Sequence, residues 1–154
     1  KPWREYAAWV LTAEAVGGLS GWLTRDGVRR YQAQVVQPPL SPPSLVFPVV
    51  WTALFALMGA GAARVYRTPP SPARSRGLAL FGVQLAFNFL WSIWFFQLQA
   101  FGFALVWLAA LWGLILWMTL TFARTDRLAA YLQIPYLLWV AFAGYLNGGV
   151  WALN

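Results

Sequence analysis

The sequence predicts an all-α integral membrane protein that folds as a bundle of five transmembrane helices. Its 154 residues are 60% hydrophobic and 18% aromatic, and only 10% are charged. Soluble domains carry about 25% charged residues. Five apolar stretches each approach the roughly 20 residues that cross a bilayer as a helix. They do not alternate between apolar and polar residues, as the strands of a membrane β-barrel do.

The five predicted helices follow one another in a single domain, residues 1–154. They cover about residues 6–23, 45–65, 78–98, 101–122 and 128–153. The first stretch follows a basic start, as a signal peptide does. However, its length and the internal Glu14 indicate that it is retained. The turn at Gln99 and Ala100 is so short that the third and fourth helices must be antiparallel neighbours.

The longer connections differ in character. Residues 24–44 are expected to form a long loop whose proline run, residues 37–43, is stiff and non-helical. Residues 66–77 contain three prolines and three arginines and are expected to form a solvated basic loop. Residues 124–127 form the last short connection.

Basic residues are unevenly shared between the two sides of the predicted bundle. The side of the N-terminus holds eight of them: Lys1, Arg4, Arg64, Arg67, Arg74, Arg76, Arg124 and Arg127. The other side holds Arg25, Arg29 and Arg30. If the protein sits in a bacterial inner membrane, the positive-inside rule places its N-terminus on the cytoplasmic side. The net charge of +7 is spread over the loops, without a basic helix or stripe, so no nucleic-acid partner is expected.

The chain contains neither histidine nor cysteine. Histidine is the usual general base and a common metal ligand, and cysteine is the usual thiolate nucleophile and soft metal ligand. No metal site, no cofactor and no ordinary acid–base catalysis is therefore expected.

Three tryptophans are predicted to lie at one depth in the membrane. With a rise of about 1.5 Å per residue, Trp51, Trp91 and Trp107 each lie about 10 Å inside the side that carries the first connection. Asn88 lies about 15 Å inside the same side. On the fifth helix Trp139, Ala143 and Asn147 share a face at i, i+4 and i+8. This pattern predicts an indole-walled ligand cavity, with core packing of the same rings as the alternative.

Glu14 is the one carboxylate well inside a predicted span. Such a group is by default a functional candidate. The alternative is a structural hydrogen bond to an amide of a neighbouring helix, such as that of Gln84 or Asn88. Small residues four apart also indicate close helix packing, and the pair Gly82 and Ala86 is the expected homodimer seam.

Three sequence blocks resemble the TspO/MBR family, the tryptophan-rich sensory and translocator proteins, also called peripheral-type benzodiazepine receptors. The blocks are Pro42-Pro43 with Phe47-Pro48-Val49-Val50-Trp51, Gln84-Leu85-Ala86-Phe87-Asn88 through Trp91, and Pro135-Tyr136-Leu137-Leu138-Trp139 through Asn147. The resemblance covers nearly the whole chain. Leu40 and Leu45 depart from it, because the family often has tryptophan at these positions. The cholesterol-type pattern is missing after Leu146.

The resemblance implies a dimeric five-helix bundle in the lipid bilayer that binds tetrapyrroles such as protoporphyrin IX, and benzodiazepine-site drugs. It places the tetrapyrrole under the first connection. The tetrapyrrole is there a bound ligand and not a cofactor. The implied ligand-binding residues are Tyr31, Pro42, Phe47, Trp51, Phe55, Asn88, Trp91, Trp139, Ala143 and Leu146. Arg29 or Arg30 is expected to meet a propionate at the mouth of the cavity.

Three functions are compatible with these expectations. The first is a membrane receptor or binding protein for a flat tetrapyrrole. The second is an enzyme that degrades porphyrin in light, in which Trp51 and Trp139 would be the electron or hydrogen donors; this rests on the resemblance alone. The third is a porphyrin or sterol transporter, which ranks last because the chain shows no inverted repeat and few charged pathway residues.

Overall fold

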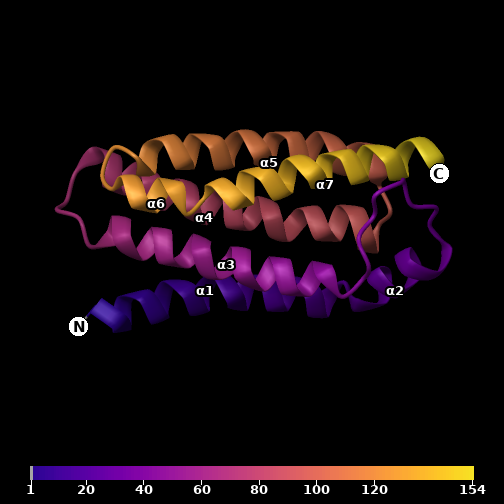
Figure 1. Cartoon of the computed structure of the whole chain (residues 1–154), viewed down its shortest axis with the longest axis horizontal. Helices are drawn as coiled ribbons and strands as arrows, with labels where there is room; N and C mark the ends of the chain where they lie inside the picture. Colours follow the sequence, from indigo (N-terminus) through magenta and orange to yellow (C-terminus); the bar gives the residue numbers. More distant parts are fainter. Residues whose placement is uncertain (1) are drawn as a thin grey trace.

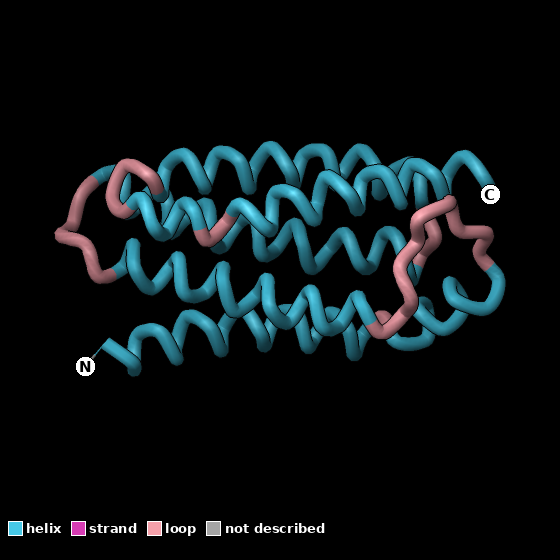
Figure 2. Tube along the Cα trace, in the orientation of Figure 1, coloured by secondary structure: helices cyan, strands magenta, loops and turns pink. Residues whose placement is uncertain are grey.

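The computed structural model describes residues 2–154, and over this range every regular element is a helix (Figure 1, Figure 2). Lys1, one of the basic residues counted above, lies outside the described residues. The elements are α1 (Pro2–Leu23), α2 (Arg25–Gln34), α3 (Val46–Tyr66), α4 (Pro72–Ser92), the π-helical turn η1 (Ile93–Gln97), α5 (Phe101–Phe122), α6 (Arg127–Tyr131) and α7 (Ile134–Leu153).

The long helices run side by side in alternating directions and form an elongated bundle (Figure 1). α1 packs mainly on α3, α4 on α5, and α5 on α7, whereas α3 and α7 make few contacts with each other. The helix α2 and the segment 35–45 cover the end of the bundle opposite the N-terminus. We call this α2-to-α3 region, residues 24–45, the cap.

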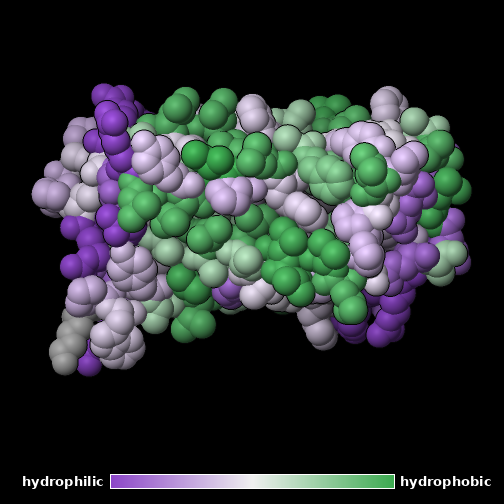
Figure 3. Space-filling view, viewed as in Figure 1, coloured by the Kyte–Doolittle hydropathy of each residue, from purple (hydrophilic) through white to green (hydrophobic). Residues whose placement is uncertain are grey.

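Four stretches of helix within residues 2–154 are long and apolar enough to cross a membrane. They are Val46–Tyr66, Pro72–Gln97, Phe101–Phe122 and Arg127–Leu153. α1 has the necessary length at 22 residues, but Arg4, Glu5 and Glu14 lower its hydropathy and it is not among the four. The surface follows the same division, with an apolar band between two hydrophilic ends (Figure 3). The fold is therefore an all-helical membrane architecture with four clear spans.

The first connection contains a helix where a loop was predicted. α2 has its charged residues on the outside, and Tyr31 is 7% exposed. Val28, Tyr31 and Val35 follow the i, i+3, i+7 spacing of an amphipathic helix, and this signal could have revealed α2 in the sequence. The short apolar stripe was overlooked because polar residues dominate the segment.

The predicted loop at residues 66–77 is also shorter than expected, because α4 begins at Pro72. The Ser71 side chain caps this helix by accepting a hydrogen bond of 3.1 Å from the backbone N–H of Arg74. Serine at the N-cap followed by proline at the first helical position is a strong start signal. The Arg74 guanidinium then donates two hydrogen bonds, of 2.9 and 3.1 Å, to the carbonyl of Tyr66 at the end of α3.

The last predicted span is divided into α6 and α7. Pro135 lies in the first turn of α7 and has no N–H with which to continue a helix from α6. The buried Gln133 bridges the break, since its amide nitrogen lies 3.3 Å from the carbonyl of Ala129 and 3.4 Å from that of Leu57 on α3. The interruption is thus held against α3 and does not loosen the bundle.

Candidate functional site: an aromatic cavity under the cap

A cavity of about 710 Å³ lies beneath the cap, between α1, α3, α4 and α7. All ten residues expected from the sequence to bind a ligand line it: Tyr31, Pro42, Phe47, Trp51, Phe55, Asn88, Trp91, Trp139, Ala143 and Leu146. Its volume lies within the range of about 300–1,000 Å³ that is usual for small-molecule sites.

One side of the cavity is aromatic. Trp51 on α3 packs against Phe55 with ring centroids 5.6 Å apart, and Trp139 on α7 meets Phe47 edge to face at 5.9 Å. Trp91 on α4 stacks on Phe95 at 4.9 Å. Because these contacts fix the rings from three different helices, the aromatic wall is preformed. Flat indole faces of this kind suit a flat, largely apolar ligand.

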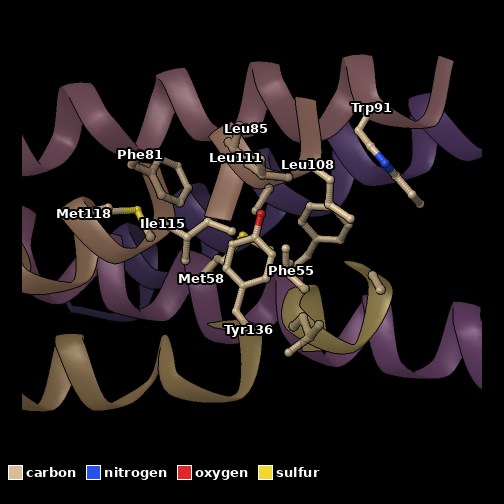
Figure 4. Packing of buried hydrophobic residues seen from close by; sticks show 14 of the residues in the cluster. Phe55, Met58, Phe81, Leu85, Trp91, Leu108, Leu111, Ile115, Met118 and Tyr136 are labelled. Atoms are coloured by element: carbon tan, nitrogen blue, oxygen red, sulfur yellow. The ribbon is translucent and has the colours of Figure 1, made fainter. Parts of the chain in front are cut away.

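Buried hydrogen bonds hold the floor of the cavity. Asn88 donates to the Tyr136 hydroxyl at 2.7 Å, and this hydroxyl donates to Gln84 Oε1 at 2.6 Å. The Trp91 indole N–H donates to Asn147 Oδ1 at 3.0 Å. Tyr136 points from α7 into the middle of the bundle, close to Met58 and Phe55 (Figure 4). These hydrogen bonds tie α4 to α7; Asn88, Trp91 and Asn147 line the cavity, whereas Gln84 and Tyr136 lie outside its lining.

Replacing Tyr136 with phenylalanine should destabilise the protein by about 1–2 kcal/mol, because the amides of Gln84 and Asn88 both lose a buried partner. Unfolding of the purified protein in mixed detergent micelles measures the change. Tyr145→Phe is the matched control, since that hydroxyl bonds an exposed carbonyl, that of Pro39. An equal loss of stability in the two variants would contradict the role given to the network.

Trp107 does not join Trp51 and Trp91 in the cavity wall, contrary to the expectation that all three indoles would line it. Its indole N–H donates to the carbonyl of Phe87 at 2.9 Å, and its ring stacks on the Phe87 ring at 4.2 Å. Trp107 therefore belongs to the contact between α4 and α5 and does not line the cavity. Its depth in the membrane was estimated from the helix rise, but its direction around the helix axis depends on which neighbour α5 packs against.

A further wall of the cavity comes from α1, and most of it was missed in the sequence. Glu14, Gly17, Gly18, Ser20 and Gly21 of α1 line the cavity, and so does Thr24 of the cap. Gly17 and Gly21 also fit a helix-packing seam, and Gly17 does pack against the Phe55 ring. The Ser20 hydroxyl is buried and has no hydrogen-bond partner within residues 2–154. A ligand atom can satisfy it.

Glu14 has no hydrogen bond with the amides considered above. Gln84 and Asn88 are instead both bonded to Tyr136. The structural alternative for Glu14 is therefore not supported, and its carboxylate remains part of the cavity wall.

The mouth of the cavity is basic. Arg25 and Arg29 line it, whereas Arg30 donates to the carbonyl of Gln97 at 3.0 Å and lies outside the lining. Of the two arginines expected at the mouth, the structure thus places Arg29 there and adds Arg25. Burial raises the pKa of the Tyr31 hydroxyl above its ordinary value, so this side chain is neutral at physiological pH.

The cap is fastened to the outer end of α7. The Tyr145 hydroxyl donates to the carbonyl of Pro39 at 2.7 Å, and Asn154 exchanges hydrogen bonds with the backbone of Val36 at 2.8 and 3.1 Å. A Cβ atom on Gly149 would collide with the Pro38 ring, so the proline run lies directly on the helix. These contacts hold Pro42 over the cavity.

These features define a class: an all-helical membrane protein with an aromatic-lined cavity under a helical cap. The family model for the TspO/MBR family matches residues 9–152. The tryptophan-rich protein TspO of Chlorobaculum tepidum is 39% identical over 91% of this chain and 89% of its own length. The translocator protein of Bos taurus is 31% identical over 99% of this chain and 92% of its own length, and the protein CrtK of Rhodobacter capsulatus is 34% identical over 94% and 89%. The chain belongs to the TspO/MBR family, and it is a membrane protein.

Proposed function

We propose that the protein is a membrane receptor that binds a flat tetrapyrrole of the protoporphyrin IX type in the cavity under the cap. The observation that carries this proposal is the convergence of Trp51, Trp91 and Trp139, from three helices, on one hollow of about 710 Å³. In this arrangement the indole faces stack on the macrocycle. Arg25 and Arg29 at the mouth bind its propionates, and the same apolar space accommodates drugs of the benzodiazepine-site type.

Titration of the purified protein with protoporphyrin IX in lipid nanodiscs tests this proposal. Because indoles line the cavity, ligand binding should quench tryptophan fluorescence saturably and with one site per chain. Mass spectrometry of the extracted protein identifies any small molecule that copurifies with it. Quenching that is no greater than that of free tryptophan in empty nanodiscs would refute the proposal.

We also propose that α1 is the fifth transmembrane span and that the N-terminus is cytoplasmic. α1 runs the length of the bundle beside α3, with which it shares an extensive contact. The basic residues Arg67, Arg76 and Arg124 lie at the end of the bundle that carries the N-terminus, which favours this end as the cytoplasmic side of a bacterial cell membrane. Labelling of single cysteines introduced at Arg4 and Gln32 from outside intact cells tests the orientation: only the second should react.

A second function, porphyrin degradation in light, is favoured by one observation. The indole N–H of Trp91 is bonded to Asn147, but those of Trp51 and Trp139 have no hydrogen-bond acceptor among residues 2–154. These two rings are free to give an electron or a hydrogen to an excited porphyrin. Under illumination, porphyrin bound to the protein should then bleach faster than porphyrin dissolved in detergent. A Trp51→Phe, Trp139→Phe variant should lose this excess bleaching rate. Equal bleaching rates in the protein complex and in detergent alone would exclude this function.

We propose that the protein is a homodimer whose seam lies on α4. Gly82 and Ala86 are exposed on this helix, and a Cβ atom at Gly82 would meet no atom within 4 Å in the single chain. Close approach of a second copy needs such small residues. Gly82→Leu should therefore shift the protein from dimer to monomer, measured as mass in detergent by light scattering. The same substitution at Gly113, which is also open, is the control and should leave the dimer intact.

A further inference from the structure

Glu14 differs from every other acidic side chain of residues 2–154 in having no partner. Glu5 pairs with Arg67 at 3.1 Å, Asp26 with Arg29 at 3.5 Å, and Asp126 with Arg64. Glu14 has neither an ion pair nor a hydrogen bond in this range, and it lines the cavity. A carboxylate without a partner at membrane depth is unfavourable, so its presence calls for an explanation in terms of the ligand.

The position of Glu14 is at the inner end of the cavity. Gly17, one turn farther along α1, packs against the ring of Phe55, which lies nine residues inside the start of α3. From Glu14 to the end of α1 at Leu23 the helix rises about 14 Å. Arg25 follows beyond that end and lines the mouth with Arg29. The cavity therefore has Arg25 and the Asp26-paired Arg29 at its mouth and one unpaired carboxylate at its inner end.

We propose that Glu14 is a specificity-determining residue that excludes tetrapyrroles with carboxylates on opposite edges of the macrocycle. The inference rests on the proposed function. Protoporphyrin carries both propionates on one edge, and that edge can face the arginines while the apolar edge faces Glu14. A porphyrin with four propionates, such as coproporphyrin, must turn two of them toward Glu14 whenever the other two face the mouth. Like charges repel strongly where little water screens them.

The experiment compares three ligands in nanodiscs by tryptophan quenching: protoporphyrin IX, coproporphyrin III and the uncharged tetramethyl ester of coproporphyrin. Glu14→Gln keeps the shape of the side chain and removes its charge. It should tighten coproporphyrin binding by about tenfold or more. The affinities for protoporphyrin and for the ester should change by less than about threefold. Glu5→Gln is the matched control, because Glu5 lies on the same helix outside the cavity lining, and it should change none of the three affinities.

Each other result counts against the proposal. The proposal is overturned if the affinity for coproporphyrin is unchanged or weaker in Glu14→Gln. It is also overturned if the affinity for the ester rises equally, because the volume of the side chain and not its charge would then explain the change. Retained protoporphyrin binding shows that the variant is folded. The affinity for coproporphyrin must also rise in a second variant, Glu14→Ala. If wild-type protein binds protoporphyrin and only the coproporphyrin shift fails, the proposed function stands and the role of Glu14 falls. If wild-type protein binds no porphyrin, both fall.

Discussion

The double variant Trp51→Ala, Trp139→Ala should bind protoporphyrin at least about 30-fold more weakly than wild type. Each substitution removes an indole face from the cavity wall, and a stacked aromatic ring contributes about 1–3 kcal/mol to the binding of a flat heterocycle. Two such losses, about 2 kcal/mol or more in total, correspond to roughly 30-fold or more in the dissociation constant. A titration of the protein in nanodiscs, followed by the change in protoporphyrin absorbance, measures the affinity without relying on the remaining tryptophans.

Trp117→Ala provides the control for this loss. Trp117 lies on α5, is 53% exposed and is not part of the cavity lining, so its removal should leave the affinity unchanged. Affinity of the double variant within a factor of three of wild type would show that porphyrin binds elsewhere. A loss of the same size in Trp117→Ala would show that lipid-facing tryptophans account for the signal.

Gly59→Ala should lower the free energy of unfolding by about 2 kcal/mol. A Cβ atom at Gly59 would fall on the Cα and N atoms of Val10, which are backbone atoms of α1 and cannot rotate away. α1 and α3 must then separate. This disrupts the most extensive contact between any two helices of residues 2–154. The loss exceeds the gain in helix propensity of about 1 kcal/mol that replacing glycine with alanine usually brings.

Gly113→Ala supplies the comparison, because a Cβ atom there would meet nothing within 4 Å. It lies inside α5, so its expected effect is neutral or stabilising, by up to about 1 kcal/mol. Unfolding of both variants in mixed micelles gives the two free energies. If Gly59→Ala were as stable as Gly113→Ala, the close approach of α1 to α3 would be wrong.

The positions of the aromatic residues along their helices could be estimated from the sequence, but their directions could not. Trp51 and Trp107 were assigned similar depths from the rise per residue, and the structure places Trp51 at the cavity and Trp107 against Phe87. Rotation about a helix axis depends on which neighbours pack on it, and no local pattern in a uniformly apolar helix reports this. For the same reason the α1 wall of the cavity was not predicted, since its small residues fit a packing seam equally well.

The sequence by itself determined the class of protein and the approximate bounds of its long helices. Those properties follow from apolar length and from the fixed rise of a helix, which are local. The tertiary structure alone decided that Trp51, Trp91 and Trp139 share one cavity, that α2 closes it, and that Glu14 lines it without a partner. These depend on how separate helices rotate and pack together, which is a property of the whole bundle.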